Sequence, residues 1–436
     1  MSEFAHESRD AMTAGASRAG YDGARPRRIV VCSTGVPHPT RGASVVLFYQ
    51  YVRALVASGW RVLHVVIVES DKDDVALHQY EADLSSFGAF EVAKCKIYTP
   101  IAVEQRGMRL RVAQLSPAVA ARIREFRADA AFLIDLASAA LLRDVAVPGA
   151  KVVWLGDLTF DTIWYHNLYD AKERPLAYLK LPLTSLRCSK WRKLYRHALA
   201  DASVVIASSH SSVAKLAALG VRSEYLPYPW PEATAATQQT QPSAALPSFL
   251  FFGTLSALGS RSAFRFLLDD VYPKLLKLWG GGRFKIFICG MRDLPEWVAI
   301  ALKDRPEFEF KGFVDRLDDL ARHCHAMLAP IDVPVGNRSR IVTAMAHGWP
   351  FVAHRHTALG NPALVSGENC LLANSATEFA AAMQRLVAEP QFASELAGAA
   401  RRCYADTFEP TRATGALLAQ IDAAMGKHYG MIETNK

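Results

Sequence analysis

The composition of the chain indicates a globular protein with room for two domains. It has 436 residues, of which 51% are hydrophobic and 21% charged, and its formal net charge is +8. A chain of this size can bury two α/β cores of roughly 200 residues each. The positive charge favours an anionic partner, and nucleic acid, nucleotide-sugars and an anionic membrane face all meet that description.

The N-terminus and the cysteines point to a reducing compartment. Residues 1–27 lack the apolar core of a signal peptide, and no run reaches the ~18 apolar residues of a membrane-spanning helix. The seven cysteines are odd in number and widely spaced, and no C-x-x-C occurs among them, so neither a disulfide framework nor a zinc knuckle is indicated. We therefore predict a cytoplasmic protein with a disordered tail over residues 1–27.

The first domain is predicted over residues 28–228. RRIVVCSTGV reads as a strand, PHPTRGAS as a loop, VVLFYQYVRALVASGW as a helix and WRVLHVVIVES as a second strand. ADAAFLIDLA, AKVVWLGDL and ADASVVIASS have the apolar runs of strands buried on both faces. This alternation predicts a parallel sheet covered by helices, which is a Rossmann-like domain.

A second α/β domain is predicted over residues 248–410. It follows a linker at 229–247, which is rich in Thr, Gln, Ala and Pro, and it precedes a C-terminal helix and tail at 411–436. Its expected strands include PSFLFFGTL, RFKIFICG, FEFKGFV and PFVAHR, and its expected helices include 262–279, 340–348 and 377–390. Open α/β sheets bind ligands at the carboxyl ends of their strands, so two such domains predict a ligand cleft between them.

The loop before helix 340–348 has the residues of an anion site. Backbone N–H groups at a helix start are unpaired and carry partial positive charge, and Arg338 and Arg340 add full charges on the same turn. Gly336 removes the Cβ that would obstruct a phosphate. The alternative is that both arginines are merely solvated, although cations at that end of a helix are disfavoured by its dipole.

The second domain resembles the C-terminal domain of GT-B glycosyltransferases of the family 4 type. The resemblance runs in order through FFGTLSALGSRSAFRFLLDDVYPKL, FKIFICG, FKGFVDRLDDL, MLAPIDVPVGNRSRIVTAMAHGWPFVAH and SGENCLLANSATEFAAAMQRLV. In the first domain it is thinner, and rests on Pro37, Pro39 and Gly42 before a helix, on WRKLYRHALADASVVIASS and on YLPYPWP. The resemblance implies two Rossmann-like domains facing a cleft, with the nucleotide-sugar donor held by the second domain and the acceptor by the first.

The resemblance also assigns residues to the donor. Arg338 and Arg340 fall where the family grips the donor diphosphate. The loop residues assigned to the phosphates are Gly253 and Thr254, and those assigned to the nucleobase pocket are Gly290, Gly312 and Phe313.

The chain departs from the family pattern at the ribose. Thr343 stands where the family usually has a glutamate that holds the ribose hydroxyls, and Val335 stands at the other position of its glutamate pair. Asp332, shortly after the strand AMLAPI, stands where the family often has an arginine. Either the nucleotide is gripped differently, or affinity has been lost.

The first domain offers candidates for acid–base chemistry. Asp157 ends a predicted strand, so its carboxylate is expected to point into the cleft and to serve as a base if the sugar configuration inverts. A turn-capping role is the alternative. Asp161 and His166 are weaker candidates. Gly42 is expected to approach the donor phosphates, with Arg41 beside it as a contact for an anion, and exposure of this loop on the surface is an equal alternative.

The segment at 176–199 combines leucines and a tryptophan with cations. These cations are Arg187, Lys190, Arg192, Lys193 and Arg196. A basic amphipathic face suits an anionic membrane, where a lipid-linked acceptor would lie, but an ordinary helix packed on the sheet is an equal alternative.

We therefore expect a glycosyltransferase that acts in the synthesis of a surface polysaccharide or glycoconjugate. Its partners would be a nucleotide-sugar and a glycan or lipid-linked acceptor, with no nucleic acid, no cofactor and no metal. His323, Cys324 and His325 lack the spacing of a metal site, and His354 to His356 read as a loop. The alternatives are a non-catalytic binding or scaffold protein of the same fold and a sugar-nucleotide epimerase.

Overall fold

A computed structural model describes most of the chain. The described residues are 25–40, 42, 44–68, 71–96, 115–143, 145, 147, 149–233, 245–255 and 257–434. Most of the predicted tail, residues 1–24, lies outside them, as do Arg41 and residues 234–244 of the predicted linker. Within the described helices, none combines the length and hydropathy that crossing a bilayer requires.

The first domain is built on a seven-stranded parallel sheet in the order β3-β2-β1-β4-β5-β6-β7. Its strands are β1 (Arg28–Thr34), β2 (Arg61–Val68), β3 (Phe90–Lys96), β4 (Ala130–Ile134), β5 (Ala150–Leu155), β6 (Val204–Ala207) and β7 (Glu224–Tyr225). Strand β4 is buried along its whole length and β2 is buried except at its first residue, Arg61, as their apolar runs predict for a sheet covered on both faces.

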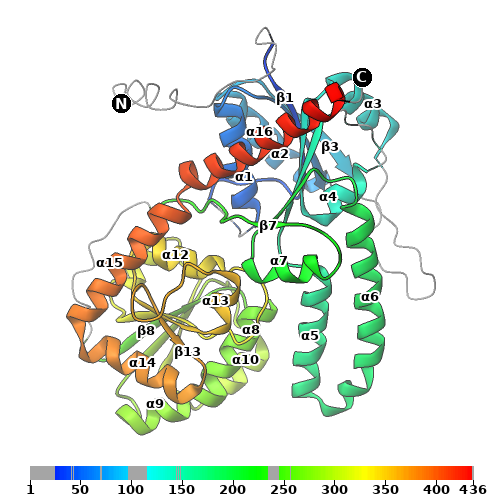
Figure 1. The fold of residues 1–436 in the computed structure, drawn as a ribbon. Helices are drawn as coiled ribbons and strands as arrows, with labels where there is room; N and C mark the ends of the chain where they lie inside the picture. The colour runs from blue at the N-terminus through cyan, green and yellow to red at the C-terminus, as the bar shows by residue number, and fades with distance from the viewer. Residues whose placement is uncertain are drawn as a thin grey trace, which may run out of the picture.

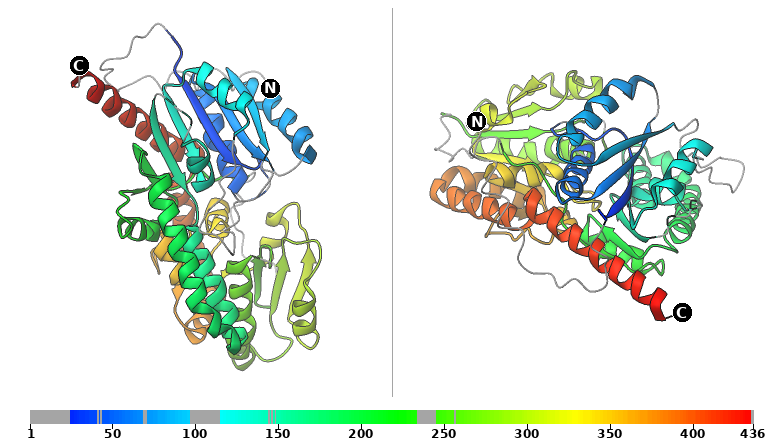
Figure 2. Two further views of the ribbon diagram at one scale, coloured as in Figure 1. Left: turned by 90° about the vertical axis from the view of Figure 1, so that its right-hand side faces the viewer. Right: turned by 90° about the horizontal axis from the view of Figure 1, so that it is seen from above.

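Helices cover both faces of this sheet. They are α1 (Ser44–Ala57), α2 (Asp74–Ser85), α3 (Pro117–Phe126), α4 (Asp135–Leu141), α5 (Thr159–Glu173), α6 (Leu181–Ala198) and α7 (His210–Ala217), with short 3₁₀ turns η2 (Asp71–Asp73) and η3 (Pro175–Lys180). Helices α5 and α6 pack against each other as a long hairpin, which projects from the sheet and reaches down beside the second domain (Figure 1, Figure 2).

The second domain is built on a six-stranded parallel sheet in the order β10-β9-β8-β11-β12-β13. Its strands are β8 (Ser248–Phe252), β9 (Lys285–Cys289), β10 (Phe308–Gly312), β11 (Ala326–Ala329), β12 (Phe351–His354) and β13 (Leu371–Ala373). Its helices are α8 (Leu258–Arg265), α9 (Tyr272–Trp279), α10 (Glu296–Leu302), α11 (Leu317–Ala321), α12 (Ser339–His347), α13 (His356–Gly360), α14 (Ala376–Ala388) and α15 (Pro390–Thr407).

The helix expected over 262–279 contains a π-helical turn, η4 (Phe266–Val271), between α8 and α9. Pro273 follows directly after this turn and lacks the N–H that an α-helical bond would need. The wider turn lets the chain pass the proline without a break, and single π turns of this kind are a recognised local adjustment.

The last helix, α16 (Pro410–Thr434), returns to the first domain. It begins beside the second domain and packs on α1 and β5 (Figure 1). At the crossing, the Trp230 amide donates to the Phe408 carbonyl at 2.8 Å, and the Tyr404 hydroxyl donates to the Trp230 carbonyl at 2.6 Å. These contacts fix the two domains to each other on the side opposite the hairpin.

The predicted fold class is confirmed: two parallel-sheet, Rossmann-like α/β domains face each other across a cavity. The carboxyl ends of both sheets point toward the space between the domains. Residues from these strand ends therefore form the site described next.

Candidate functional site

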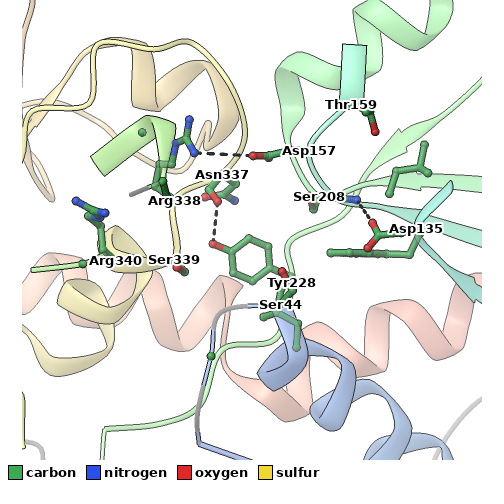
Figure 3. A pocket seen from close by; sticks show the side chains of 18 of the residues that line it. Ser44, Asp135, Asp157, Thr159, Ser208, Tyr228, Asn337, Arg338, Ser339 and Arg340 are labelled. Carbon is green, nitrogen blue, oxygen red and sulfur yellow. Dashed lines mark hydrogen bonds and ion pairs between the residues drawn. The ribbon is translucent and has the colours of Figure 1, made fainter. Parts of the chain in front are cut away.

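A cavity of about 720 Å³ lies between the two domains. The first domain lines it with residues at the ends of β1, β4 and β5, and the second domain lines it with the loop after β8 and the start of α12. Figure 3 shows the cavity with Arg338 and Arg340 on one side and Asp135 and Asp157 on the other. The site is thus where parallel α/β sheets bind ligands, at their carboxyl edges.

Arg340 is a half-buried cation without a carboxylate partner among the described residues. Its guanidinium donates to the Ser260 hydroxyl and lies over the Phe251 ring, 5.5 Å from the ring centre. Its Nη1 is buried and has no hydrogen-bond partner within the described chain. Burial, and then the nearby Arg338, lower the pKa of Arg340 to about 10. A buried charge in this state is stabilised most by an anion that enters the cavity.

Arg338 is the N-cap residue of α12 and spans the gap between the domains. Its Nη1 lies 3.8 Å from Oδ2 of Asp157, and its side chain is 18% exposed (Figure 3). At that distance the ion pair is loose, so an incoming phosphate can compete for the guanidinium. Arg338 and Arg340 therefore present two positive charges at a helix start, beside free N–H groups.

Glycine is required at two points of this wall. Gly253 has a φ of +130°, and a Cβ there would lie 2.5 Å from Nη2 of Arg340. Gly336 has a φ of +76°, and a Cβ there would lie 2.0 Å from Oδ1 of Asp157, across the domain boundary. The missing side chains let Arg340 reach the β8 loop and let the two domains touch.

The ribose departure has a structural consequence. Thr343 lines the cavity, but its hydroxyl donates to the Ser339 carbonyl at 3.0 Å, which leaves only its acceptor lone pairs for a ligand. Val335, at the other glutamate position, is buried. Asn337 also lines the cavity, and both polar atoms of its side chain are buried, with the Tyr225 hydroxyl beside them. Asn337, which the sequence analysis did not identify, is therefore a candidate for hydrogen bonding to the nucleotide.

Asp157 lies directly across the cavity from the arginines. It follows β5, as expected, and its side chain is 42% exposed. Its carboxylate is in contact with Arg338 and with the backbone at Gly336. This position suits either a base toward an acceptor hydroxyl or a contact that closes the cleft.

Asp135 is a second carboxylate in the cavity, and sequence reasoning missed it. It follows β4 and has a φ of +69°, which is rare for a residue with a Cβ and costs of order 1–3 kcal/mol. Its Oδ1 accepts from the Gly156 amide at 3.1 Å. Burial, and to a smaller extent the charge of Asp157, raise the pKa of Asp135 to about 6. The available sequence signal was an aspartate at the end of a fully apolar strand.

Other predicted site residues fall in different places. Thr254, Gly253 and Gly42 line the cavity. Gly290, Gly312 and Phe313 are not among its lining residues, and the Phe313 side chain is 61% exposed. Their assignment to a nucleobase pocket stays a prediction.

The weaker acid–base candidates are engaged in ion pairs. Asp161 accepts from Lys215, and His166 lies 3.5 Å from Asp170 on the exposed side of α5. Neither lines the cavity. Within the described residues, no group of three or more His, Cys, Asp or Glu side chains is arranged to hold a metal ion. All seven cysteines are described and none is in a disulfide.

A family match covers much of the second domain. Residues 246–389 match the model of the family described as "Glycosyl transferases group 1". A search among curated proteins finds none that matches significantly. The match contains β8, both arginines and Thr343, so the family pattern coincides with one wall of the cavity.

Solved structures share the whole fold. HepE from Anabaena, in complex with UDP and glucose, is similar with a TM-score of 0.61 and 15% identity, over 91% of this chain and 100% of that one. Sucrose-phosphate synthase from Thermosynechococcus elongatus is similar with a TM-score of 0.62 and 16% identity, over 91% and 100%. A glycosyltransferase from Rickettsia africae has a TM-score of 0.62 and 10% identity, over 92% and 99%. The family match and the common GT-B fold support the prediction that this chain is a glycosyltransferase.

Proposed function

We propose that the protein transfers a sugar from a nucleoside-diphosphate-sugar donor to a glycan or lipid-linked acceptor. The observation that carries this proposal is Arg340, a half-buried side chain whose guanidinium has a buried, unpartnered Nη1 and no carboxylate, set beside Arg338 at a helix start. A diphosphate satisfies both guanidinium groups with charge-assisted hydrogen bonds. The preference for the family 4 subtype rests on the sequence resemblance.

The two walls of the cavity suit the two ends of the reaction. The bond between the anomeric carbon and the diphosphate oxygen breaks, and the arginines stabilise the negative charge that develops on the leaving diphosphate. The acceptor oxygen then bonds to the anomeric carbon and loses its proton. If the configuration inverts, Asp157 or Asp135 takes the proton, and if it is retained, the departing phosphate takes it.

The choice of donors to test follows from the relatives. HepE was solved with UDP and glucose, so UDP-sugars are the first donors to try, followed by GDP-sugars. The role in surface polysaccharide or glycoconjugate synthesis, and a place in the cytoplasm at the inner face of the membrane, are further parts of the proposal that rest on the sequence.

A non-catalytic role is favoured by one observation. Thr343 replaces the ribose glutamate and donates its proton to the Ser339 carbonyl, so the nucleotide lacks a bidentate partner at that point. A binding protein of the same fold would hold a nucleotide-sugar without consuming it. A sugar-nucleotide epimerase would consume the donor without any acceptor.

Donor consumption separates the three functions. The purified protein is incubated with a panel of UDP- and GDP-sugars, with and without a lipid extract as acceptor, and free nucleotide and remaining sugar-nucleotide are measured. A transferase releases nucleotide only when acceptor is present, and Arg338→Ala abolishes the release. Turnover of the sugar-nucleotide without acceptor identifies an epimerase, and binding without any turnover identifies the non-catalytic role.

A further inference from the structure

The tip of the α5–α6 hairpin exposes a cluster of large apolar side chains. This cluster, called the leucine tip below, consists of Leu176, Tyr178, Leu179, Leu183 and Leu186, which are 83, 46, 78, 68 and 63% exposed. Twelve large apolar side chains are exposed in the described part of the chain, and five of them lie between Leu176 and Leu186. Single exposed leucines are ordinary, but a contiguous apolar patch marks an interaction surface.

The leucine tip stands on a fixed support. Thr184, Cys188 and Trp191 form the buried side of α6, and the Cys188 thiol donates to the Phe160 carbonyl at 3.2 Å. Arg261 of the second domain pairs with Asp170 at 3.2 Å, near the far end of α5. Helix packing and this ion pair therefore hold the hairpin in place, and the exposed leucines are the end of a packed element.

The surroundings of the leucine tip are strongly basic. Besides Arg192, the cations of residues 172–193 that form no ion pair within the described chain are Lys172, Arg174, Lys180, Arg187, Lys190 and Lys193. The one carboxylate between residues 171 and 193 is Glu173, and it is already paired with Arg261 and Arg265 of the second domain. The tip thus combines uncovered apolar surface with cations on both sides of the hairpin. At the end of α5, Lys172 and Arg174 share a pocket with Asp269, Asp270 and Asp332 of the second domain, whereas no carboxylate occurs in the sequence from Arg174 to Lys193.

The surface differs from the basic face that the sequence predicted. Arg192 lies over the Phe160 ring, 5.2 Å from its centre, and Nε of Arg196 donates to the Leu219 carbonyl at 3.1 Å. Trp191 is buried and lines the interdomain cavity. These three side chains contact other residues of the first domain, because the C-terminal end of α6 packs on that domain, so we do not include them in the exposed surface.

We propose that the leucine tip docks onto the surface of an anionic lipid bilayer. The leucines enter the boundary between headgroups and acyl chains, while the surrounding lysines and arginines contact lipid phosphates. A second copy of the chain fits this surface less well, because a two-fold contact would bring the same cations face to face.

Docking at the tip would place the cavity within reach of the bilayer. Tyr195, which lines the cavity, is twelve residues beyond Leu183 on α6, and at 1.5 Å per residue this is about 18 Å. A lipid-linked acceptor would have to extend over this distance from the bilayer to the cavity. This last step rests on the proposed function, whereas docking itself does not.

Vesicle co-sedimentation of the full chain tests the docking. Wild type, Leu179→Glu/Leu183→Glu and Lys180→Glu/Arg187→Glu are mixed with vesicles of phosphatidylcholine, with and without phosphatidylglycerol. The matched controls are Ile300→Glu and Lys303→Glu, which change an exposed leucine-sized residue and an exposed cation on the second domain. We expect wild type and both controls to bind the anionic vesicles, and both tip variants to lose at least tenfold in partitioning.

Two results would overturn the docking proposal. One is equal partitioning of the tip variants and wild type, or no binding by any of them. The other is a concentration-dependent dimer of the wild type that the leucine variant dissolves, without any vesicle binding, which would assign the tip to a second copy. Calorimetry with UDP on the same variants keeps the two proposals apart, because donor binding at the distant cavity is expected to be unchanged.

Discussion

The two walls of the interdomain cavity differ in charge and in how that charge is held. The second-domain wall carries Arg338 and Arg340, and Arg340 has a buried Nη1 without a partner and no carboxylate beside it. The first-domain wall carries Asp135 and Asp157, and burial with a neighbouring charge raises the pKa of Asp135. Each wall thus holds like charges close together, which costs stability in the empty protein.

This difference indicates which group each wall binds. An anion reduces the repulsion between two guanidinium groups, and a proton reduces the repulsion between two carboxylates. A leaving diphosphate would supply the anion at the second-domain wall, and an acceptor hydroxyl would supply the proton at the first-domain wall. Strain of this kind, held in place by the surrounding fold, is common where a protein binds or reacts.

The largest effect is expected from the second-domain wall. Arg340→Met keeps the length of the side chain and removes its charge, and we expect a loss of about 10²–10³-fold in kcat/KM, as for other preorganised groups at a leaving oxyanion. Arg316→Met, at a side chain that is 70% exposed, is the control and is expected to leave the rate unchanged. Steady-state kinetics with the donor identified from the panel would check both, and equal rates for the two variants would remove Arg340 from the site.

The first-domain wall is probed by Asp135→Asn. If Asp135 takes the acceptor proton, the rate falls by about 10²-fold or more. The unfolding free energy of the variant should instead rise at pH values where Asp135 of the wild type is ionised. Because the folded pKa is raised from 3.8 to about 6, the carboxyl stabilises the fold below pH 3.8, and this contribution is lost as the pH rises through 6.

The stability test of this variant is therefore pH-dependent. Asparagine tolerates the positive φ and carries no charge, so Asp135→Asn should be more stable than wild type at pH 8, by on the order of 3 kcal/mol at most. At pH 4 the two should unfold at nearly the same denaturant concentration. If Asp135→Asn is less stable than wild type at pH 8, the ionised Asp135 carboxylate does not destabilise the fold.

The contact between the walls is probed by Gly336→Ala. The new Cβ would meet Oδ1 of Asp157 at 2.0 Å, and the φ of +76° adds backbone strain. We expect the unfolding free energy to fall by about 1–3 kcal/mol and the rate by about tenfold, because the domains must separate. Gly367→Ala is the matched control, with a φ of +86° and no atom within 4 Å of the added Cβ. A loss of stability and rate no greater than in the control would show that the walls do not meet there.

The smallest effect is expected at Ser260, which accepts a hydrogen bond from Arg340. Ser260→Ala leaves the guanidinium charge in place and removes one partner, so donor affinity should fall by about three- to tenfold, the range of a single hydrogen bond. Ser262→Ala, which removes a hydroxyl that donates to the Gly259 carbonyl, serves as control. In the Arg340→Met background, Ser260→Ala should have no further effect on affinity.

Much of the fold was predictable because its signals are local. Apolar runs and turn residues marked most strands of both sheets, and the glycine and arginines before α12 marked a helix start with positive charge. The C-terminal helix was predicted, but the placement of elements that depends on distant packing was not. The return of α16 to the first domain and the protrusion of the α5–α6 hairpin depend on contacts between residues far apart in the sequence.

The site was predictable to a similar extent. The sequence placed Arg338, Arg340 and Asp157 at strand ends and a helix start, and the structure brings them to one cavity. Asp135 was missed although it follows an apolar strand. Its positive φ could not be predicted, because an aspartate, unlike a glycine, does not mark a left-handed backbone in a sequence. That Asp157 touches Gly336 also had no sequence signal, because it depends on how the two domains meet.

Isothermal titration calorimetry with UDP, repeated with GDP, measures the central claim most directly. Wild type should bind one of the two nucleoside diphosphates at one site per chain, and Arg340→Met should lose at least tenfold in affinity while the Arg316→Met control retains it. Equal affinity of wild type and Arg340→Met would contradict the assignment of the second-domain wall to a diphosphate.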